Sequence, residues 1–112
     1  LTGMGCALVT SGPGATNLMT PILASFYDSV PVLYLTGQVA TFRMVQDGEV
    51  RQIGFQETQI VEMVRTITKY AVTVRHARDV IPELEKAIAT AKEGRPGPVL
   101  IDLPDDITRT EL

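Results

Sequence analysis

A Ser-Gly-Pro-Gly turn is the stretch of this sequence best suited to contact a ligand. The turn and the helical pattern after it carry five candidate binding residues, Ser11, Gly12, Pro13, Gly14 and Asn17. The glycines free the backbone for positive φ, and the proline stiffens the turn. An apolar run typical of a strand precedes the turn, and ligands of open α/β sheets bind at the carboxyl ends of strands. We therefore expect the backbone here to approach a flat or anionic ligand, with an ordinary strand–helix turn as the alternative.

Three familiar glycine-rich motifs do not fit this turn. A dinucleotide fingerprint needs Gly-x-Gly-x-x-Gly after a strand, but Gly3 and Gly5 precede the strand and Leu8 occupies the third glycine position. A nucleophile elbow needs Gly-x-Ser-x-Gly, and Val9 stands at its first glycine. The Gly-Lys-Ser/Thr of a P-loop is absent from the sequence. Ser11 is therefore a poor candidate nucleophile.

Phe55-Gln56-Glu57 is the second candidate segment, and it follows residues 39–54, which lack a clear period. A loop of that length in a compact domain is usually functional. We predict that the segment opens a helix, whose N-terminus adds partial positive charge, and that the Gln56 amide donates to a carbonyl or carboxylate. The alternative is that Gln56 and Glu57 are ordinary polar residues of a first helical turn.

The other chemistry-bearing residues are scattered along the chain. Asp105-Asp106 has the residue types of an acid–base or metal site, with a cap or solvated loop as the alternative. Arg95 enters the last strand from a rigid Pro/Gly turn, where it could clamp an anion or a neighbouring subunit. His76 is predicted to lie at the surface, and Cys6 to be inert core. We assign no metal ligand.

Apolar runs and amphipathic patterns follow one another along the chain and predict the elements that position these residues. We expect buried strands at 4–9, 32–36 and 99–103, the first of them buried on both faces, and a brief strand at 70–74. Amphipathic patterns predict helices from Ala15 to Asp28, from Phe55 to Ile67 and from Val80 to Ala91. Pro21 predicts a kink in the first helix, or a restart capped by Thr20. The alternation predicts an α/β fold, an open parallel sheet with helices on both faces.

Composition limits the partners and the setting. The 112 residues suffice for one domain, and 45% of them are hydrophobic. A net charge of −3 argues against nucleic acid or an anionic membrane as main partner. The single cysteine allows no internal disulfide and favours a cytoplasmic setting, and neither a membrane-spanning run nor a signal peptide is evident. Because Leu1 leads almost directly into a strand pattern without an initiator methionine, we expect a truncated domain of a longer protein.

Six segments, in this order, resemble the N-terminal pyrimidine-binding domain of thiamine-diphosphate enzymes, and they are most similar to the acetolactate synthase large subunit. They are 10–17, 28–32, 36–39, 54–58, 67–69 and 94–104. The resemblance covers nearly the whole chain, so that residues 1–112 are interpreted as a single domain, truncated at its N-terminus, of such an enzyme.

The resemblance implies a thiamine-diphosphate-dependent 2-keto acid decarboxylase and carboligase, a transferase or lyase of branched-chain amino acid biosynthesis. In this family pyruvate loses carbon dioxide and the enamine attacks a second carbonyl, while the cofactor carries the chemistry. The family also implies Mg²⁺ held outside this chain, FAD as a further group, a homodimer or homotetramer, and a site between two subunits. We expect the isolated chain to be inactive.

The resemblance also implies roles for individual residues. Gly12, Pro13, Gly14 and Asn17, with Ser11, would lie along the pyrimidine. Phe55 and Gln56 would face the substrate as the catalytic residues, and Arg95 would lie near FAD.

The sequence also departs from the family. The activating glutamate of the family lies upstream of this stretch, and Glu49, Glu57 and Glu62 are in the wrong place to replace it. Asp105 stands where acetolactate synthases have lysine, and the segment from Phe42 to Ile53 is longer than is typical. Three alternatives remain open. They are an acetolactate-synthase-like enzyme with another carbonyl acceptor, a pyruvate oxidase or other decarboxylase, and a non-catalytic assembly module.

Overall fold

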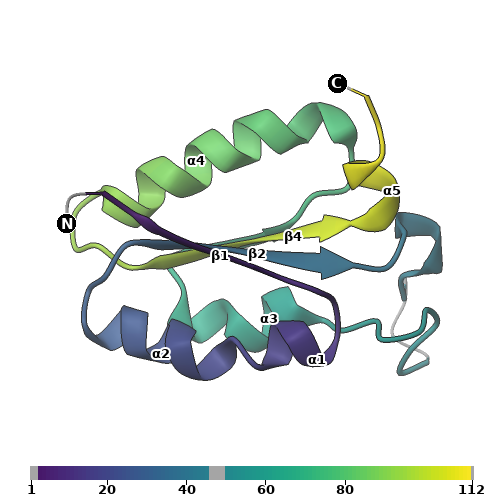
Figure 1. The fold of residues 1–112 in the computed structure, drawn as a ribbon, viewed down its shortest axis with the longest axis horizontal. Coiled ribbons are helices and arrows are strands. Elements are labelled where there is room, and N and C mark those ends of the chain that lie inside the picture. The colour runs from purple at the N-terminus through teal and green to yellow at the C-terminus, as the bar shows by residue number, and fades with distance from the viewer. Residues whose placement is uncertain (1–2, 46–49, 112) are drawn as a thin grey trace.

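The computed structural model describes residues 3–45 and 50–111 and has three layers, with a parallel sheet between two layers of helices (Figure 1). The strands pair in the order β1-β2-β4-β3, and all three pairings are parallel. This confirms the predicted open parallel α/β sheet. The strands are β1 (Gly5–Val9), β2 (Val32–Gln38), β3 (Tyr70–Thr73) and β4 (Pro98–Pro104).

Helices cover both faces of the sheet, as predicted (Figure 1). One layer holds α1 (Pro13–Thr16), α2 (Met19–Tyr27) and α3 (Ile60–Val64). The opposite layer holds α4 (Val80–Lys92) and α5 (Asp105–Thr108). Three single 3₁₀ turns complete the described elements: η1 (Thr41–Arg43), η2 (Arg65–Ile67) and η3 (Ala77–Asp79).

Alternation along the strands divides the buried side chains into two cores. Tyr34 and Leu100 pack with Ile22 under the α1–α3 layer. Val99 and Ile101 pack with the α4–α5 layer. Because successive strand residues point to opposite faces, each central strand serves both cores. The apolar runs of β2 and β4 are therefore buried on both sides, as the sequence predicted.

The first helix is interrupted, as Pro21 predicted, but its details differ. The helical turn α1 already begins at Pro13, and α2 restarts at Met19. Pro21 lies in the first turn of α2, where a missing backbone N–H is tolerated. The predicted cap by Thr20 is wrong, because Leu18 holds the N-cap position without a side-chain hydrogen bond.

The prediction that β1 is buried on both faces is wrong. Within the part of the chain that the structure describes, β1 pairs with β2 alone, so it forms an edge of the sheet. Helix α4 packs mainly on β4, β3 and β2. Leu8 is 72% exposed, and Cys6 is exposed too, which corrects its assignment to the core.

Three further predictions concern His76, membrane-spanning helices and the long loop. His76 is exposed, as predicted. Among residues 3–45 and 50–111, no helix is both long and apolar enough to pass through a membrane. In the long loop predicted over 39–54, Gln46, Asp47, Gly48 and Glu49 lie outside the described residues.

Candidate functional site

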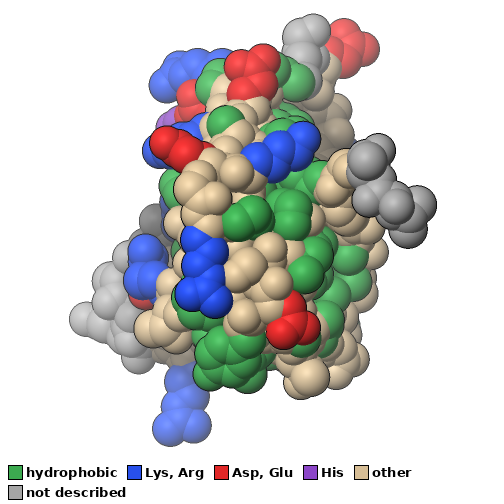
Figure 2. Space-filling view, turned by 90° about the vertical axis from the view of Figure 1, so that its left-hand side faces the viewer, with side chains coloured by type: hydrophobic (Ala, Val, Ile, Leu, Met, Phe, Trp, Pro, Cys, Tyr) green, Lys and Arg blue, Asp and Glu red, His purple; other side chains and the backbone are tan. Residues whose placement is uncertain are grey.

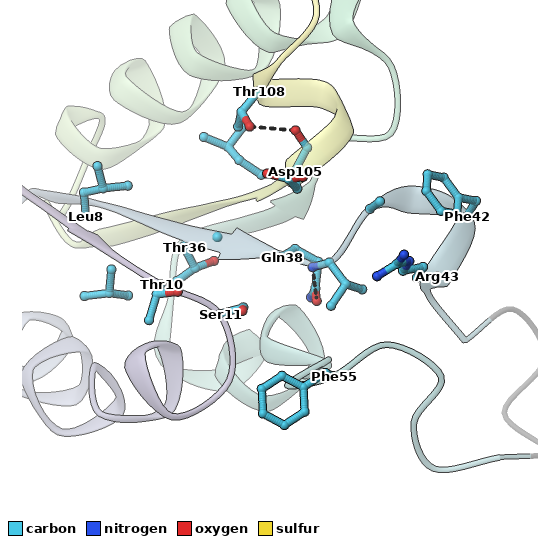
Figure 3. Close-up of a pocket in the computed structure, with 15 residues that line it drawn as sticks. Leu8, Thr10, Ser11, Thr36, Gln38, Phe42, Arg43, Phe55, Asp105 and Thr108 are labelled. Atoms are coloured by element: carbon cyan, nitrogen blue, oxygen red, sulfur yellow. Dashed lines mark hydrogen bonds between the residues drawn. The ribbon is translucent and has the colours of Figure 1, made fainter.

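An open pocket of about 580 Å³ lies at the carboxyl ends of β1, β2 and β4 (Figure 3). Parallel strands place these ends at one edge of the sheet, which is where α/β folds bind ligands. Ser11 lines it after β1, Gln38 at the end of β2, and Phe55 from the loop before α3. The pocket therefore brings together residues from both segments that the sequence singled out.

The two glycines of the Ser-Gly-Pro-Gly turn meet different structural requirements. Gly12 has φ 62° and ψ −120°, a backbone conformation that side chains disfavour. Gly14 has no such φ, but a Cβ there would lie 2.7 Å from Cγ2 of Thr10. The turn is thus held by backbone geometry at one glycine and by close packing at the other.

Only part of the turn faces the pocket. Ser11 lines it, whereas Gly12, Pro13, Gly14 and Asn17 are not among its lining residues. Pro13, the first residue of α1, and Asn17, which follows its last residue, are both exposed. The backbone N–H of Asn17 donates to the carbonyl of Pro13 at 3.1 Å and closes the helical turn. The roles of all five residues toward a cofactor therefore stay predictions.

Gly12 also brings the two candidate segments into contact. A Cβ on Gly12 would lie 2.9 Å from Cβ of Gln56 and 3.1 Å from its carbonyl oxygen. Gln56 itself has φ 62°, one of two positive values among the described non-glycine residues. Two backbone segments with positive φ therefore meet here, and the absence of a side chain at Gly12 lets them approach.

The segment after residue 54 is a turn, and the prediction that Phe55 opens a helix is wrong. Helix α3 begins only at Ile60. The positive φ of Gln56 is incompatible with a right-handed helix, so the charge of a helix N-terminus does not act on this amide. The Phe55 side chain is 85% exposed beside the pocket (Figure 3).

Glu57 is a buried carboxylate, for which the sequence suggested no role beyond that of a polar residue in a first helical turn. The residue is only 7% exposed. Its carboxylate accepts hydrogen bonds from the backbone N–H groups of Val45 at 2.5 Å, Ile53 at 2.7 Å and Gly54 at 3.3 Å. The side chain of Gln59 donates to it as well, at 3.3 Å. No helical period could reveal this role, since the donors belong to an irregular loop.

A second buried carboxylate, Asp102 on β4, lies beneath the pocket. Its Oδ1 accepts from Thr36 at 2.7 Å, and its Oδ2 accepts from Gln38 at 3.0 Å and Thr73 at 3.1 Å. Burial raises the pKa of Asp102, and the three hydrogen bonds and the charge of Arg75 oppose that rise. An acid inside an otherwise apolar strand was the available sequence signal.

The Gln38 side chain is fully engaged by the protein. Its Nε2 donates to Asp102 and to the carbonyl of Thr58 at 2.7 Å, and its Oε1 accepts from the N–H of Val39 at 3.0 Å. Gln38 therefore ties the end of β2 to the segment that carries Phe55. It lines the pocket without a free amide proton to offer a ligand.

Asp105 and Asp106 have separate partners. Asp105 forms an exposed ion pair with Arg109 at 3.0 Å. Asp106 accepts from the backbone N–H of Thr41 at 2.9 Å and from its hydroxyl at 2.6 Å. Each carboxylate thus has a local structural partner, as expected under the alternative of a cap or a solvated loop. Among residues 3–45 and 50–111, no three His, Cys, Asp or Glu side chains are grouped to hold a metal ion.

Arg95 lies at the opposite end of the sheet from the pocket, because it precedes the amino end of β4. Its Nε donates to the hydroxyl of Ser29 at 2.6 Å. A smaller cavity of about 290 Å³ there is lined by Phe26, Tyr27, Lys69, Arg95 and Pro96. Figure 2, which faces this end, shows hydrophobic side chains beside Lys and Arg.

Comparison with known proteins places these features in a family. Residues 1–63 match the family described as "Thiamine pyrophosphate enzyme, N-terminal TPP binding domain". The mitochondrial acetolactate synthase of Schizosaccharomyces pombe is 44% identical over 108 residues, 96% of this chain and 15% of the relative. The acetolactate synthase isozyme 3 large subunit of Escherichia coli is 44% identical over 104 residues, 93% of this chain and 17% of the relative. The chloroplastic acetolactate synthase of Arabidopsis thaliana is 45% identical over 103 residues, 92% of this chain and 14% of the relative.

The chain thus spans roughly a sixth of the length of these relatives. The match nevertheless runs through the Ser-Gly-Pro-Gly turn and the Phe55-Gln56 segment, the two parts that meet at the pocket. The chain belongs to the thiamine pyrophosphate enzyme family, as a member of its N-terminal, TPP-binding domains.

Proposed function

We propose that this chain forms one wall of the thiamine pyrophosphate site in a 2-keto acid decarboxylase and carboligase of the acetolactate synthase type. The observation that carries the proposal is the contact between Gly12 and Gln56 at the carboxyl edge of the sheet. It joins the candidate cofactor turn to the candidate substrate segment. The acetolactate synthases among the relatives support the reaction class.

The pocket suits a flat, partly apolar group. The Ser11 turn presents backbone close to the opening, and Phe55 offers an aromatic surface that the protein leaves 85% exposed. When bound, thiamine pyrophosphate supplies the electron sink on which a 2-keto acid loses carbon dioxide. In that setting the chain's own residues orient the ring, cover it from water and direct the Gln56 amide toward the substrate.

The other expected groups fall outside this pocket. We propose, from the family resemblance, that Mg²⁺ is bound by residues outside this chain. We propose that Arg95, at the far end of the sheet, serves FAD rather than the thiamine site. We further propose a homodimer or homotetramer, pyruvate as the first substrate, and a cytoplasmic setting, although some relatives are mitochondrial or chloroplastic.

Assays of the protein at its natural length test the proposal. With pyruvate, thiamine pyrophosphate and Mg²⁺ we expect acetolactate, or a mixed product when a second carbonyl compound is added. Acetaldehyde or acetate as the main product would indicate the decarboxylase or oxidase alternative. Absence of any pyruvate consumption by a folded protein that binds no thiamine pyrophosphate would indicate the assembly module. The isolated chain of 112 residues should form no acetolactate.

A further inference from the structure

The buried carboxylate of Glu57 has no place in the proposed chemistry, yet it immediately follows the two residues that face the substrate in that proposal. We propose that Glu57 is a positioning residue, whose carboxylate fixes Phe55 and Gln56 against the Ser11–Gly14 turn. This inference rests on the proposed function for the roles of Phe55 and Gln56, while the hydrogen bonds that carry it stand independently.

The first step is that the segment cannot hold its own conformation. Residues 55–59 form neither helix nor strand, and Gln56 has a positive φ of 62°. A non-glycine residue persists in such a conformation only where its surroundings impose it. Phe55 is 85% exposed, so its side chain contributes little packing that could hold the segment in this conformation.

The second step is that Glu57 supplies the missing restraint. Its carboxylate binds three backbone N–H groups, of which those of Ile53 and Gly54 lie just before Phe55. The third, that of Val45, belongs to the chain after η1. Hydrogen bonds from a buried carboxylate to backbone N–H groups are among the stronger ones in proteins. The Glu57 side chain therefore binds two parts of the chain, one at Val45 and one at Ile53 and Gly54. Because Glu57 directly follows Gln56, these hydrogen bonds restrain Gln56 as well.

The third step is that the other side of the segment is tied as well. The N–H of Glu57 donates to the carbonyl of Gly54 at 3.1 Å, and the carbonyl of Thr58 accepts from Gln38 at 2.7 Å. Gln38 is itself held by Asp102 on β4. With its end fixed to the sheet and its start fixed by Glu57, the segment holds Gln56 against Gly12.

Hydrogen exchange of the protein at its natural length tests the restraint without relying on turnover. In the unaltered protein the amides of Ile53 and Gly54 should be protected although they lie outside any helix or strand. In Glu57→Gln, which keeps the shape but replaces one acceptor oxygen by a donor, their exchange should accelerate by about tenfold to a hundredfold. The exposed Glu62 on α3, paired with Arg65 of η2, gives the control Glu62→Gln, in which exchange at Ile53 and Gly54 should be unchanged.

A double-mutant cycle tests whether the restraint acts through Gln56. If Glu57 positions Gln56, the losses in kcat for Glu57→Gln and Gln56→Ala should be strongly non-additive, with KM for pyruvate changing less than kcat. A merely structural role would give additive losses. Additive losses would overturn the coupling.

Hydrogen exchange and the kinetic cycle together distinguish failure of the positioning role from failure of the proposed function. Unprotected amides at Ile53 and Gly54 in the unaltered protein would overturn the positioning role even if Glu57→Gln did not fold. Unchanged exchange in a folded Glu57→Gln protein would overturn it too. Protected amides in a protein without any activity on pyruvate would leave the restraint standing and refute the proposed function instead.

Discussion

Replacement of Gly12 by alanine tests how closely the turn and the Gln56 segment are fitted to each other. The substitution has two separable costs. The backbone at φ 62° and ψ −120° is sparsely populated for alanine, at a cost of about 1–3 kcal/mol. The new Cβ would also lie 2.9 Å from Cβ of Gln56 and 3.1 Å from its carbonyl oxygen. Such overpacking against backbone costs about 1–3 kcal/mol more.

Gly94 offers a matched control. It has a similar positive φ of 59°, but a Cβ there would meet no atom within 4 Å. Gly94→Ala therefore carries only the backbone cost of a positive φ, which is about 1–3 kcal/mol. We expect Gly12→Ala to lower the free energy of unfolding by at least about 1 kcal/mol more than Gly94→Ala does.

The assay is denaturant unfolding of the two variants, followed by circular dichroism, with hydrogen exchange of residues 55–57 as a local probe. Adding Gln56→Gly to Gly12→Ala removes the closest contacting atom, so the double variant should recover part of the loss. Equal destabilisation by Gly12→Ala and Gly94→Ala, with exchange at 55–57 unaffected, would refute the contact.

Further predictions concern individual side chains. Because burial holds the pKa of Asp102 above its unfolded value, its contribution to stability is present below the unfolded pKa and lost as pH rises through the folded one. Asp102→Asn should therefore flatten that part of the pH dependence of unfolding, and an unchanged curve would contradict it. Burial acts to raise the pKa of Asp106, but its hydrogen bonds with Thr41 and nearby backbone N–H groups outweigh it and lower the pKa. Its contribution is present above the unfolded pKa and lost as pH falls through the folded one, so Asp106→Asn should reduce acid sensitivity in a titration of unfolding. Phe55→Ala should change stability by no more than about 0.5 kcal/mol, since the side chain is exposed, yet weaken thiamine pyrophosphate or pyruvate binding in calorimetry or kinetics.

The central part of the fold could be predicted from the sequence because local patterns determine it. Leu33 and Tyr34 on β2, like Val99 and Leu100 on β4, lie in apolar runs that are typical of strands covered on both faces. For β1 the same pattern wrongly predicted burial on both faces. The apolar side chains of Cys6 and Leu8 do not indicate whether another element covers the strand. Burial of a strand depends on its place in the sheet order, which is a non-local property.

The candidate site was predictable in its composition but only in part in its geometry. The turn at Gly12 and the Phe55-Gln56 segment were singled out, and they do meet. The helix expected to start at Phe55 was wrong because the Glu57 carboxylate binds loop N–H groups and Gln56 takes a positive φ. Glu57 and Asp102 were missed as anchors, since their partners are backbone groups of an irregular loop or side chains on other strands, which no sequence period indicates.

An exchange of segments tests most directly whether this chain forms a wall of a thiamine pyrophosphate site. Residues 1–112 would replace the matching stretch of the Escherichia coli acetolactate synthase isozyme 3 large subunit, with which the chain is 44% identical over 104 residues. We predict that the hybrid binds thiamine pyrophosphate and forms acetolactate from pyruvate, and that Gln56→Ala in the hybrid impairs acetolactate formation. A folded hybrid that binds no thiamine pyrophosphate, or a fully active Gln56→Ala hybrid, would contradict the proposed site.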